Sequence, residues 1–391
     1  MVRTSLLKGD FPFVSLVSYV PCVPIDLSHV VTSPPPWTPW DDEQNICSQG
    51  GFVTLLKYII PKYVAWAWQY FTEKFCNFCF FSILLHQLEK SELKMPKVRE
   101  KYEHLRKPEW LKISLRSTAD SAEVEQIVEG RCLHTICSSG MCPNKAECWS
   151  RRTATFMILG DICTRTCRFC ATQTGRPLPP DEAEPDKVAE SVKLMGLKHV
   201  VVTSVTRDDL EDHGARIWAR TVEAIRRDNP NATIELLISD MDARPELLDV
   251  VLASRPDIVG HNIETVERLT PEVRSRAKYR TSLATLKHIA DSGAVAKSGI
   301  MVGLGESEEE VLATLKDLRE VGVSIVTLGQ YLRPTKEHYP VKAYITPEKF
   351  EEYRLAALDM GFSYCASAPL VRSSYLADAA LDAVKKVCRT K

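Results

Sequence analysis

From about Phe156 onward, short runs of β-branched residues alternate with amphipathic helical stretches. This alternation is typical of βαβ units, in which parallel strands form one sheet and the intervening helices pack against it. The predicted strands are Thr155–Leu159, His199–Thr203, Thr233–Ile238, Asp257–His261, Val295–Val302 and Ser324–Leu328. The predicted helices are Ala183–Met195, Asp208–Arg227, Pro245–Ser254, Thr281–Ser292, Glu306–Glu320 and Pro347–Met360. Six repeats are too few for a closed eight-stranded barrel, so we expect an α/β fold that is a partial (β/α)6 TIM-type barrel or an open sheet, and we favour the partial barrel.

Four polar or reactive segments come directly after predicted strands. They are Cys163, Thr203–Arg207, His261–Glu264 and Gly303–Glu306. Partial barrels and open parallel sheets both place their chemistry at the carboxyl ends of the strands. We therefore expect these segments to converge on one site.

Charge and hydropathy exclude several classes of partner. The chain has 391 residues, with 50 basic and 51 acidic side chains, so it has no general attraction for nucleic acid or anionic membranes. The longest apolar stretch near the front, Phe75–Leu85, is about half of the ~20 residues that span a bilayer. We expect neither a nucleic-acid nor a membrane partner.

Residues 1–94 have a different composition from the rest of the chain. They contain 16 of the 31 aromatic residues but only 15 of the 101 charged ones. Their Lys and Arg residues are too sparse for a transit peptide, and no small-residue cleavage site stands out. From Met95 the sequence becomes charged and helix-forming. We expect residues 1–94 to be an atypical extension, non-native or disordered, and the functional protein to begin near Met95.

Seven of the 13 cysteines fall within 39 residues, unlike the even spread of a disulfide framework. Cys163, Cys167 and Cys170 form a C-x3-C-x2-C triplet in the loop after the first predicted strand. Three thiolates can hold three irons of a cubane cluster and leave the fourth iron free to bind a small ligand and pass it an electron. A structural zinc site, the alternative, normally has four ligands in two closely spaced pairs.

A second triplet, Cys137, Cys142 and Cys148, has the spacing C-x4-C-x5-C. This spacing is too loose for one zinc knuckle, and soft thiolates suit an iron–sulfur cluster. A second cluster is therefore implied. Cys132 is either a fourth thiolate or a small buried hydrophobic residue. Cys76 and Cys79 are more easily explained as buried residues or as part of the extension than as a third metal site.

The first triplet resembles the cysteine motif of radical S-adenosylmethionine (SAM) enzymes. The second, with Pro143-Asn144 and Glu147-Cys148-Trp149, makes the chain similar to the lipoyl synthases. Further matching segments are Gly160–Arg165, Thr203–Val205, Arg207–Leu210, His261–Val266, Gly299–Glu306, Gly329–Leu332 and Arg372–Tyr375. The resemblance extends from about Arg106 to Ala380.

The resemblance implies two 4Fe-4S clusters and SAM as cofactors. Cys163, Cys167 and Cys170 match the ligands of the SAM-cleaving cluster. Cys137, Cys142, Cys148 and Ser374 match those of an auxiliary cluster. Because a serine oxygen is a harder ligand than thiolate, that corner is a plausible place for the auxiliary cluster to open.

The same resemblance divides the chain into parts. Residues 95–152 form an N-terminal arm with the auxiliary-cluster motif, residues 153–335 the partial barrel, and residues 336–391 a C-terminal segment that supplies Ser374.

The implied activity is insertion of two sulfur atoms at carbons 6 and 8 of a carrier-bound octanoyl group, which forms the lipoyl cofactor. Those C–H bonds are unactivated, so no side-chain base can remove the protons and cofactor radicals must act. The auxiliary cluster would donate the sulfur and need rebuilding. The rivals are another sulfur-inserting radical SAM enzyme, similar to biotin synthase or a methylthiotransferase, and a non-catalytic metal-binding module.

The resemblance also implies partners. They are octanoylated carrier domains (the transacylase subunit of 2-oxoacid dehydrogenases and the glycine cleavage H protein), an electron donor such as ferredoxin or flavodoxin, and an iron–sulfur carrier protein. Clusters and free thiols favour a reducing compartment, the cytoplasm or, in a eukaryote, the mitochondrion.

Further residues at predicted strand ends are candidates for SAM binding. They are Thr203, Ser204, Arg207, Asn262, Glu264, Gly303 and Glu306. Glycines after strands also make ordinary turns, and Arg207–Asp209 also fits a solvated helix start.

Two positions depart from the family pattern. His213 and Ala368 stand where the family usually has glycine, which matters if the backbone there needs a positive φ.

Overall fold

The computed structural model describes residues 105–113, 118–375, 377 and 380. The chain divides into two compact units, Met1–Lys101 and Tyr102–Lys391, and every described residue belongs to the second. The expectations for residues 1–94, for Cys76 and Cys79 and for a start near Met95 lie outside the described residues.

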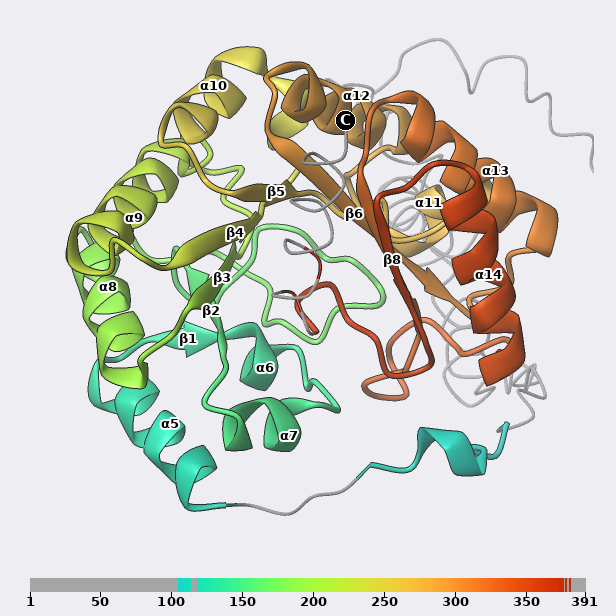
Figure 1. Ribbon diagram of the computed structural model, residues 1–391, viewed down its shortest axis with the longest axis horizontal. Coiled ribbons are helices and arrows are strands. Elements are labelled where there is room, and N and C mark those ends of the chain that lie inside the picture. Colours follow the sequence, from blue (N-terminus) through green and yellow to red (C-terminus); the bar gives the residue numbers. More distant parts are fainter. Residues whose placement is uncertain (1–104, 114–117, 376, 378–379, 381–391) are drawn as a thin grey trace, which may run out of the picture. The chain divides into compact units, whose positions relative to one another are not determined.

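One curved eight-stranded sheet forms the centre of the second unit (Figure 1). Its strands are β1 His134–Thr135, β2 Thr155–Ile158, β3 His199–Ser204, β4 Thr233–Leu237, β5 Ile258–Gly260, β6 Val295–Val302, β7 Ile325–Gln330 and β8 Tyr364–Ser367. They follow one another in sequence order, with β1 antiparallel to β2 and all other neighbours parallel. β1 and β8 are not paired with each other, so the barrel is open. The predicted partial α/β barrel is confirmed.

The six predicted strands correspond to β2 through β7, and β1 and β8 extend the sheet at its two edges. β1 has only two residues, too few to carry a period-2 pattern. β8 consists of Tyr364-Cys365-Ala366-Ser367, which lacks the β-branched residues that mark the other parallel strands.

The helices surround the sheet (Figure 1). They are α5 Ala119–Gly130, α6 Ile136–Ser139, α7 Lys145–Ser150, α8 Glu184–Met195, α9 Ala215–Asp228, α10 Pro245–Ala253, α11 Thr270–Val273, α12 Tyr279–Asp291, α13 Glu308–Glu320 and α14 Pro347–Asp359, with 3-10 turns η5 Glu109–Leu111, η6 Met241–Ala243 and η7 Glu267–Leu269. All six predicted helices are present. Among the described residues no helix is both long and apolar enough to cross a membrane.

Helix α9 begins seven residues later than predicted. The sequence suggested a start at Asp208, but Asp208 and Asp209 bind arginines within the loop, and Gly214, with φ +84°, immediately precedes the helix. A residue with left-handed backbone cannot continue a right-handed helix, so the helix begins after Gly214.

The hydrophobic core lies between the sheet and the surrounding helices. Val202 of β3 and Leu236 of β4 are fully buried, in one cluster with Trp218 of α9 and Leu286 of α12. A smaller cluster joins Ile258, Ile325 and Ala380. Ala380, beyond β8, therefore lies near the amino ends of β5 and β7.

Candidate functional site

The second cysteine triplet lies in two short helices and the turn between them, next to β1. Cys137 is in α6, Cys142 in the turn and Cys148 in α7. The amide of Cys142 donates to the carbonyl of Cys137 at 3.1 Å, and that of Cys148 to the carbonyl of Asn144 at 2.9 Å. These turns bring all three thiols to one pocket, which Ser374 also lines. The structure thus gathers the four residues predicted for the auxiliary cluster.

Two long-range hydrogen bonds fix the segment that carries Ser374. The buried amide of Asn144 donates from Nδ2 to the carbonyl of Leu370 at 2.7 Å. The hydroxyl of Tyr375 donates to Oε1 of Glu147 at 3.0 Å. These contacts explain why Asn144, Glu147 and Tyr375 accompany the cysteines, a role that their spacing in the sequence did not reveal.

The pocket contains three thiols and a buried cation. Burial, and then the neighbouring Cys137 and Cys142, raise the pKa of Cys148 to about 12. Burial also lowers the pKa of Arg372, whose guanidinium lines the pocket and donates to the carbonyl of Val371 at 2.6 Å. Arg372 forms no ion pair with a carboxylate of the described residues. Thiolates that lie close together repel one another unless a cation binds between them. Because thiolates are soft ligands, this donor set fits an iron–sulfur cluster.

Cys132 takes no part in this pocket. It is exposed, and it is absent from the residues that line the cavity. The eight cysteines of the described residues are free thiols.

The first triplet lies in the loop after β2. The amide of Cys163 donates to the carbonyl of Gln173 at 2.8 Å, and the amide of Gly175 donates to the carbonyl of Cys163 at 3.1 Å, which closes the loop. Burial raises the pKa of Cys170, and the nearby thiols of Cys167 and Cys163 raise it further. The three half-buried sulfurs are thus close to one another, and they fit a second cluster for the same reason.

Residues that the sequence reasoning did not select hold this loop from outside. The amide of Thr166 donates to Oγ of Ser275 at 3.0 Å. Nε2 of His338 lies 3.0 Å from the carbonyl of Cys170, and the amide of Tyr339 donates to the carbonyl of Arg168 at 2.8 Å. These partners lie more than 100 positions from the triplet, so no local motif could have indicated them.

Two of the predicted SAM-binding side chains make hydrogen bonds within the protein. Thr203 Oγ1 donates to the carbonyl of Leu237 at 2.9 Å. The buried guanidinium of Arg207 donates to both carboxylate oxygens of Asp209, each at 2.9 Å, and to the carbonyl of Leu159. Arg207 thus lies inside the structure rather than at a solvated helix start.

Gly303 and Glu306 form a tight turn after β6. The carboxylate of Glu306 accepts the amides of Gly303 at 2.5 Å and Leu304 at 2.9 Å. Gly303 has φ +97°, and a Cβ there would lie 2.2 Å from Nε2 of Gln330. Glycine is therefore required by the backbone conformation and by the close approach of Gln330.

Asn262 and Glu264 follow β5, and Ser204 ends β3. Nδ2 of Asn262 donates to Oγ of Ser373 at 2.7 Å, which links the barrel to the segment that carries Ser374. Glu264 has φ +69°, unusual for a residue with a side chain, and burial raises the pKa of its carboxyl group. Left-handed backbone at such a residue is concentrated at functional sites.

The two departures from the family pattern differ in their backbone. His213 has φ +48°, so a side chain occupies a left-handed position there. Ala368 is not among the residues with positive φ and needs no glycine.

Comparison with known proteins gives consistent results. The model of the radical SAM superfamily matches residues 157–318. A lipoyl synthase of Porphyromonas gingivalis is 58% identical over 277 residues, covering 71% of this chain and 98% of its own. Those of Parabacteroides distasonis (56%, covering 71% and 98%) and Bacteroides fragilis (58%, covering 70% and 95%) are as similar.

The solved structures are much more remote. Methylornithine synthase has a TM-score of 0.43 at 14% identity, covering 56% of this chain and 72% of its own. The maturase HydG of the FeFe-hydrogenase has a TM-score of 0.44 at 14% identity, covering 63% of each chain. The sequence comparison is therefore the informative one, because the match covers almost the full length of each relative. On this sequence identity, the chain belongs to the lipoyl synthase family of the radical SAM superfamily.

Proposed function

We propose that the chain inserts two sulfur atoms at carbons 6 and 8 of an octanoyl group on a lipoyl-carrier protein, which forms the lipoyl cofactor. The pocket that gathers Cys137, Cys142, Cys148 and Ser374 is the observation that supports this most strongly. A second cysteine triplet is not needed for SAM cleavage, so its assembly favours a dedicated source of sulfur.

In this proposal the two triplets have separate tasks. Cys163, Cys167 and Cys170 hold the SAM-cleaving 4Fe-4S cluster, and Cys137, Cys142, Cys148 and Ser374 hold the auxiliary one. With SAM bound, these groups supply one-electron reduction, hydrogen abstraction from unactivated carbon, and sulfur. The chain itself binds and orients them and excludes water.

Ser374 has the most specific task among the ligands. Its oxygen is a harder donor than the three thiolates, so Ser374 would be the ligand that the auxiliary cluster releases most easily. Asn144 and Tyr375 hold the serine in place through their bonds to Leu370 and Glu147. Arg372 balances the negative charge that thiolates and serine bring to the pocket.

The predicted SAM contacts divide into two groups. Ser204, Asn262 and Glu264 are the side chains proposed to face SAM. Thr203, Gly303 and Glu306 shape the loops at the strand ends through their hydrogen bonds, whereas Arg207 is held inside the structure by Asp209 and Leu159 and is not proposed to face SAM.

The proposed partners follow from the reaction. The substrates are the octanoylated transacylase subunit of 2-oxoacid dehydrogenases and the glycine cleavage H protein. Ferredoxin or flavodoxin supplies electrons, and an iron–sulfur carrier protein rebuilds the auxiliary cluster. We propose the cytoplasm as the compartment, or the mitochondrion in a eukaryotic cell. We also propose residues 95–152, 153–335 and 336–391 as arm, barrel and C-terminal segment.

Anaerobic reconstitution of the full chain, followed by assay with an octanoylated carrier domain, tests the proposal. We expect about eight irons per chain and a lipoylated product seen by intact mass. Two clusters without sulfur insertion into the octanoyl carrier would favour another sulfur-inserting radical SAM enzyme. A colourless protein that contains zinc would favour a non-catalytic metal-binding module.

A further inference from the structure

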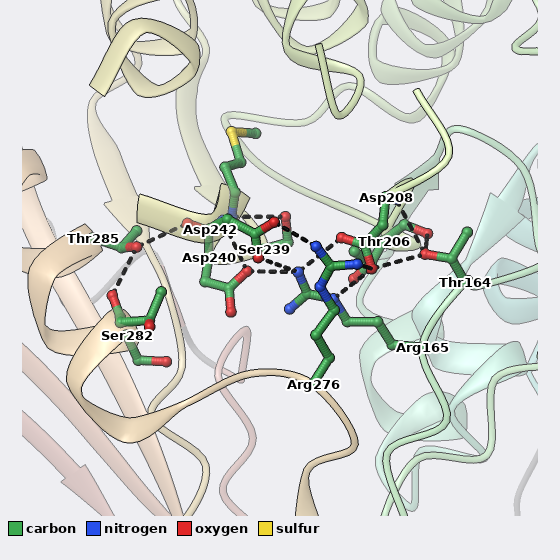
Figure 2. Close-up of polar contacts among 12 residues, drawn as sticks. Thr164, Arg165, Thr206, Asp208, Ser239, Asp240, Asp242, Arg276, Ser282 and Thr285 are labelled. Carbon is green, nitrogen blue, oxygen red and sulfur yellow. Dashed lines mark hydrogen bonds and ion pairs between the residues drawn. The ribbon is translucent and has the colours of Figure 1, made fainter. Parts of the chain in front are cut away.

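A network of ion pairs connects two arginines with three aspartates, and Arg165 in it lies between Cys163 and Cys167 in the sequence (Figure 2). Arg165 donates from Nε and Nη2 to the two carboxylate oxygens of Asp208, at 2.9 and 2.8 Å. Its Nη2 also lies 2.8 Å from Asp240 and 3.4 Å from Asp242. Arg276 closes the network at 2.7 Å from Asp242.

The network joins the cysteine loop to the carboxyl ends of two strands. Arg165 lies between Cys163 and Cys167, Asp208 follows β3, and Asp240 follows β4. The side chains of Arg165, Asp208 and Asp240 are 5%, 8% and 1% exposed. At such burial a charged pair is poorly screened by salt, so these contacts hold the loop firmly.

The carboxylates of Asp208 and Asp242 are already paired with guanidinium groups. Ligand atoms of Asp208, His213 and Asp242 lie close enough together for a metal ion, but Arg165 and Arg276 pair with both carboxylates. A cation would have to displace two guanidinium groups, so these residues do not form a metal site.

The network continues through the hydroxyl group of Thr164 and the backbone of Thr206 to the sulfur of Cys163. Oγ1 of Thr164 donates to Asp208 at 3.2 Å and to the carbonyl of Thr206 at 3.0 Å, and the amide of Thr164 donates to the same carbonyl at 3.0 Å. The amides of Thr206 and Arg165 then each donate to Sγ of Cys163 at 3.4 Å. Every residue that presents an N–H to this sulfur is thus held by the side chains of Arg165, Asp208 and Thr164.

We infer that Arg165 and Asp208 are positioning residues that aim two backbone N–H groups at Sγ of Cys163 and thereby make the SAM-cleaving cluster easier to reduce. This rests on the proposed role of Cys163 as a cluster ligand. The cluster gains one electron from an external donor, and no atom is transferred. Hydrogen bonds to a ligand sulfur stabilise the more negative, reduced state, so they raise the reduction potential.

Simple charge effects would give a different pattern. If only Coulomb attraction mattered, Arg165→Lys would leave the potential unchanged, and Asp208→Asn would raise it because a negative charge is lost. Loss of positioning lowers the potential in both variants, because neither can form the two-pronged pair that fixes the loop. The sign of the Asp208→Asn shift therefore separates the two explanations.

The matched control is Asp209→Asn. Asp209 is the next residue in the same loop and pairs with Arg207 in the same two-pronged way, but its side chain makes no hydrogen bond or ion pair with the described residues of the cysteine loop. The substitution removes the same charge and the same type of ion pair. The reduction potential of the SAM-responsive cluster in Asp209→Asn should equal that in the unmodified chain.

The experiment is a redox titration followed by electron paramagnetic resonance, on the reconstituted full chain with and without SAM. The signal that responds to SAM reports the SAM-cleaving cluster. More negative potentials for Arg165→Lys and Asp208→Asn, with Asp209→Asn unchanged, support the inference. A reduction potential in Asp208→Asn that is unchanged or more positive overturns the inference. If Arg165→Lys does not retain its cluster, Asp208→Asn alone decides. If the unmodified chain shows no SAM-responsive signal, the proposed function itself fails.

Discussion

The two cysteine triplets are held by opposite means. The first is fixed within the barrel by buried ion pairs from Arg165 and by backbone bonds from adjacent strand ends. The second is completed by a distant segment, held by the neutral Asn144–Leu370 bond and the exposed bond of Tyr375 to Glu147. The proposed SAM-cleaving site is thus held rigidly, whereas the proposed sulfur-donating site is closed by neutral hydrogen bonds at the segment that carries Ser374.

The largest effect is expected from Cys163→Ala. Removal of one of three thiolates from the rigid triplet should abolish both SAM cleavage and lipoyl formation, while about four irons remain at the other triplet. Cys365→Ala is the control, because Cys365 is buried in β8 and belongs to neither triplet. Methionine release and iron content measure the outcome. Unchanged lipoyl formation in Cys163→Ala would contradict the ligand assignment.

Ser374→Ala should separate the two sites. We expect SAM cleavage to persist while lipoyl formation is lost, because only the second pocket loses a ligand. Ser374→Cys replaces the hard oxygen by a soft thiolate, so it should retain the second cluster but release sulfur more slowly. Methionine release and carrier mass are measured side by side. Equal loss of both activities in Ser374→Ala would show that the two sites are not independent.

Asn144→Ala should loosen the segment that carries Ser374 without removing a proposed ligand. Loss of the donor to Leu370 costs about 1–2 kcal/mol, which is about tenfold in the closing equilibrium. Lipoyl formation should fall and SAM cleavage should not. Asn229→Ala removes an equivalent bond, from Nδ2 to the carbonyl of Ala189 at 2.9 Å, far from both triplets. If this control lowers lipoyl formation equally, the effect of Asn144 is one of general stability.

The last expected effect is on the stability of the barrel and not on activity. Burial, then the positive charge of Arg274, lower the pKa of His261 to about 4 from 6.5. Below pH 6.5 His261 becomes protonated in the unfolded chain, whereas in the folded chain it stays neutral until about pH 4. The free energy of unfolding therefore falls by about 1–3 kcal/mol as the pH drops through this range. Urea unfolding of the cluster-free chain at pH 7 and 5 measures it.

His261→Gln is the comparison for that measurement. The variant lacks the titrating group, so its stability should depend less on pH between 7 and 5. An identical pH dependence in both chains would mean that His261 is not held neutral by the barrel.

Sequence periodicity was sufficient for the repeating part of the fold. β2 through β7 are short, largely apolar runs that are mostly buried, and such runs are visible without knowledge of their partners. The start of α9 was wrong, because the carboxylates of Asp208 and Asp209 bind arginines that the local pattern does not show.

The candidate site was predictable only in part. The cysteine spacings indicated two metal centres, whereas Ser374 was selected by family resemblance alone. Ser275 and His338 were missed because a contact between residues more than 100 positions apart leaves no local signal. Asn144 was noticed as part of a motif, but its bond to Leu370 spans 226 positions.

The Asn144–Leu370 bond also constrains how the protein is made. Chains emerge from the ribosome with their amino-terminal part first. The three thiols of the second pocket are therefore synthesised long before the serine that completes their site, and the first triplet and its strands come between them. A nascent chain can thus display two sets of three cysteines before the serine that completes the second pocket has been synthesised.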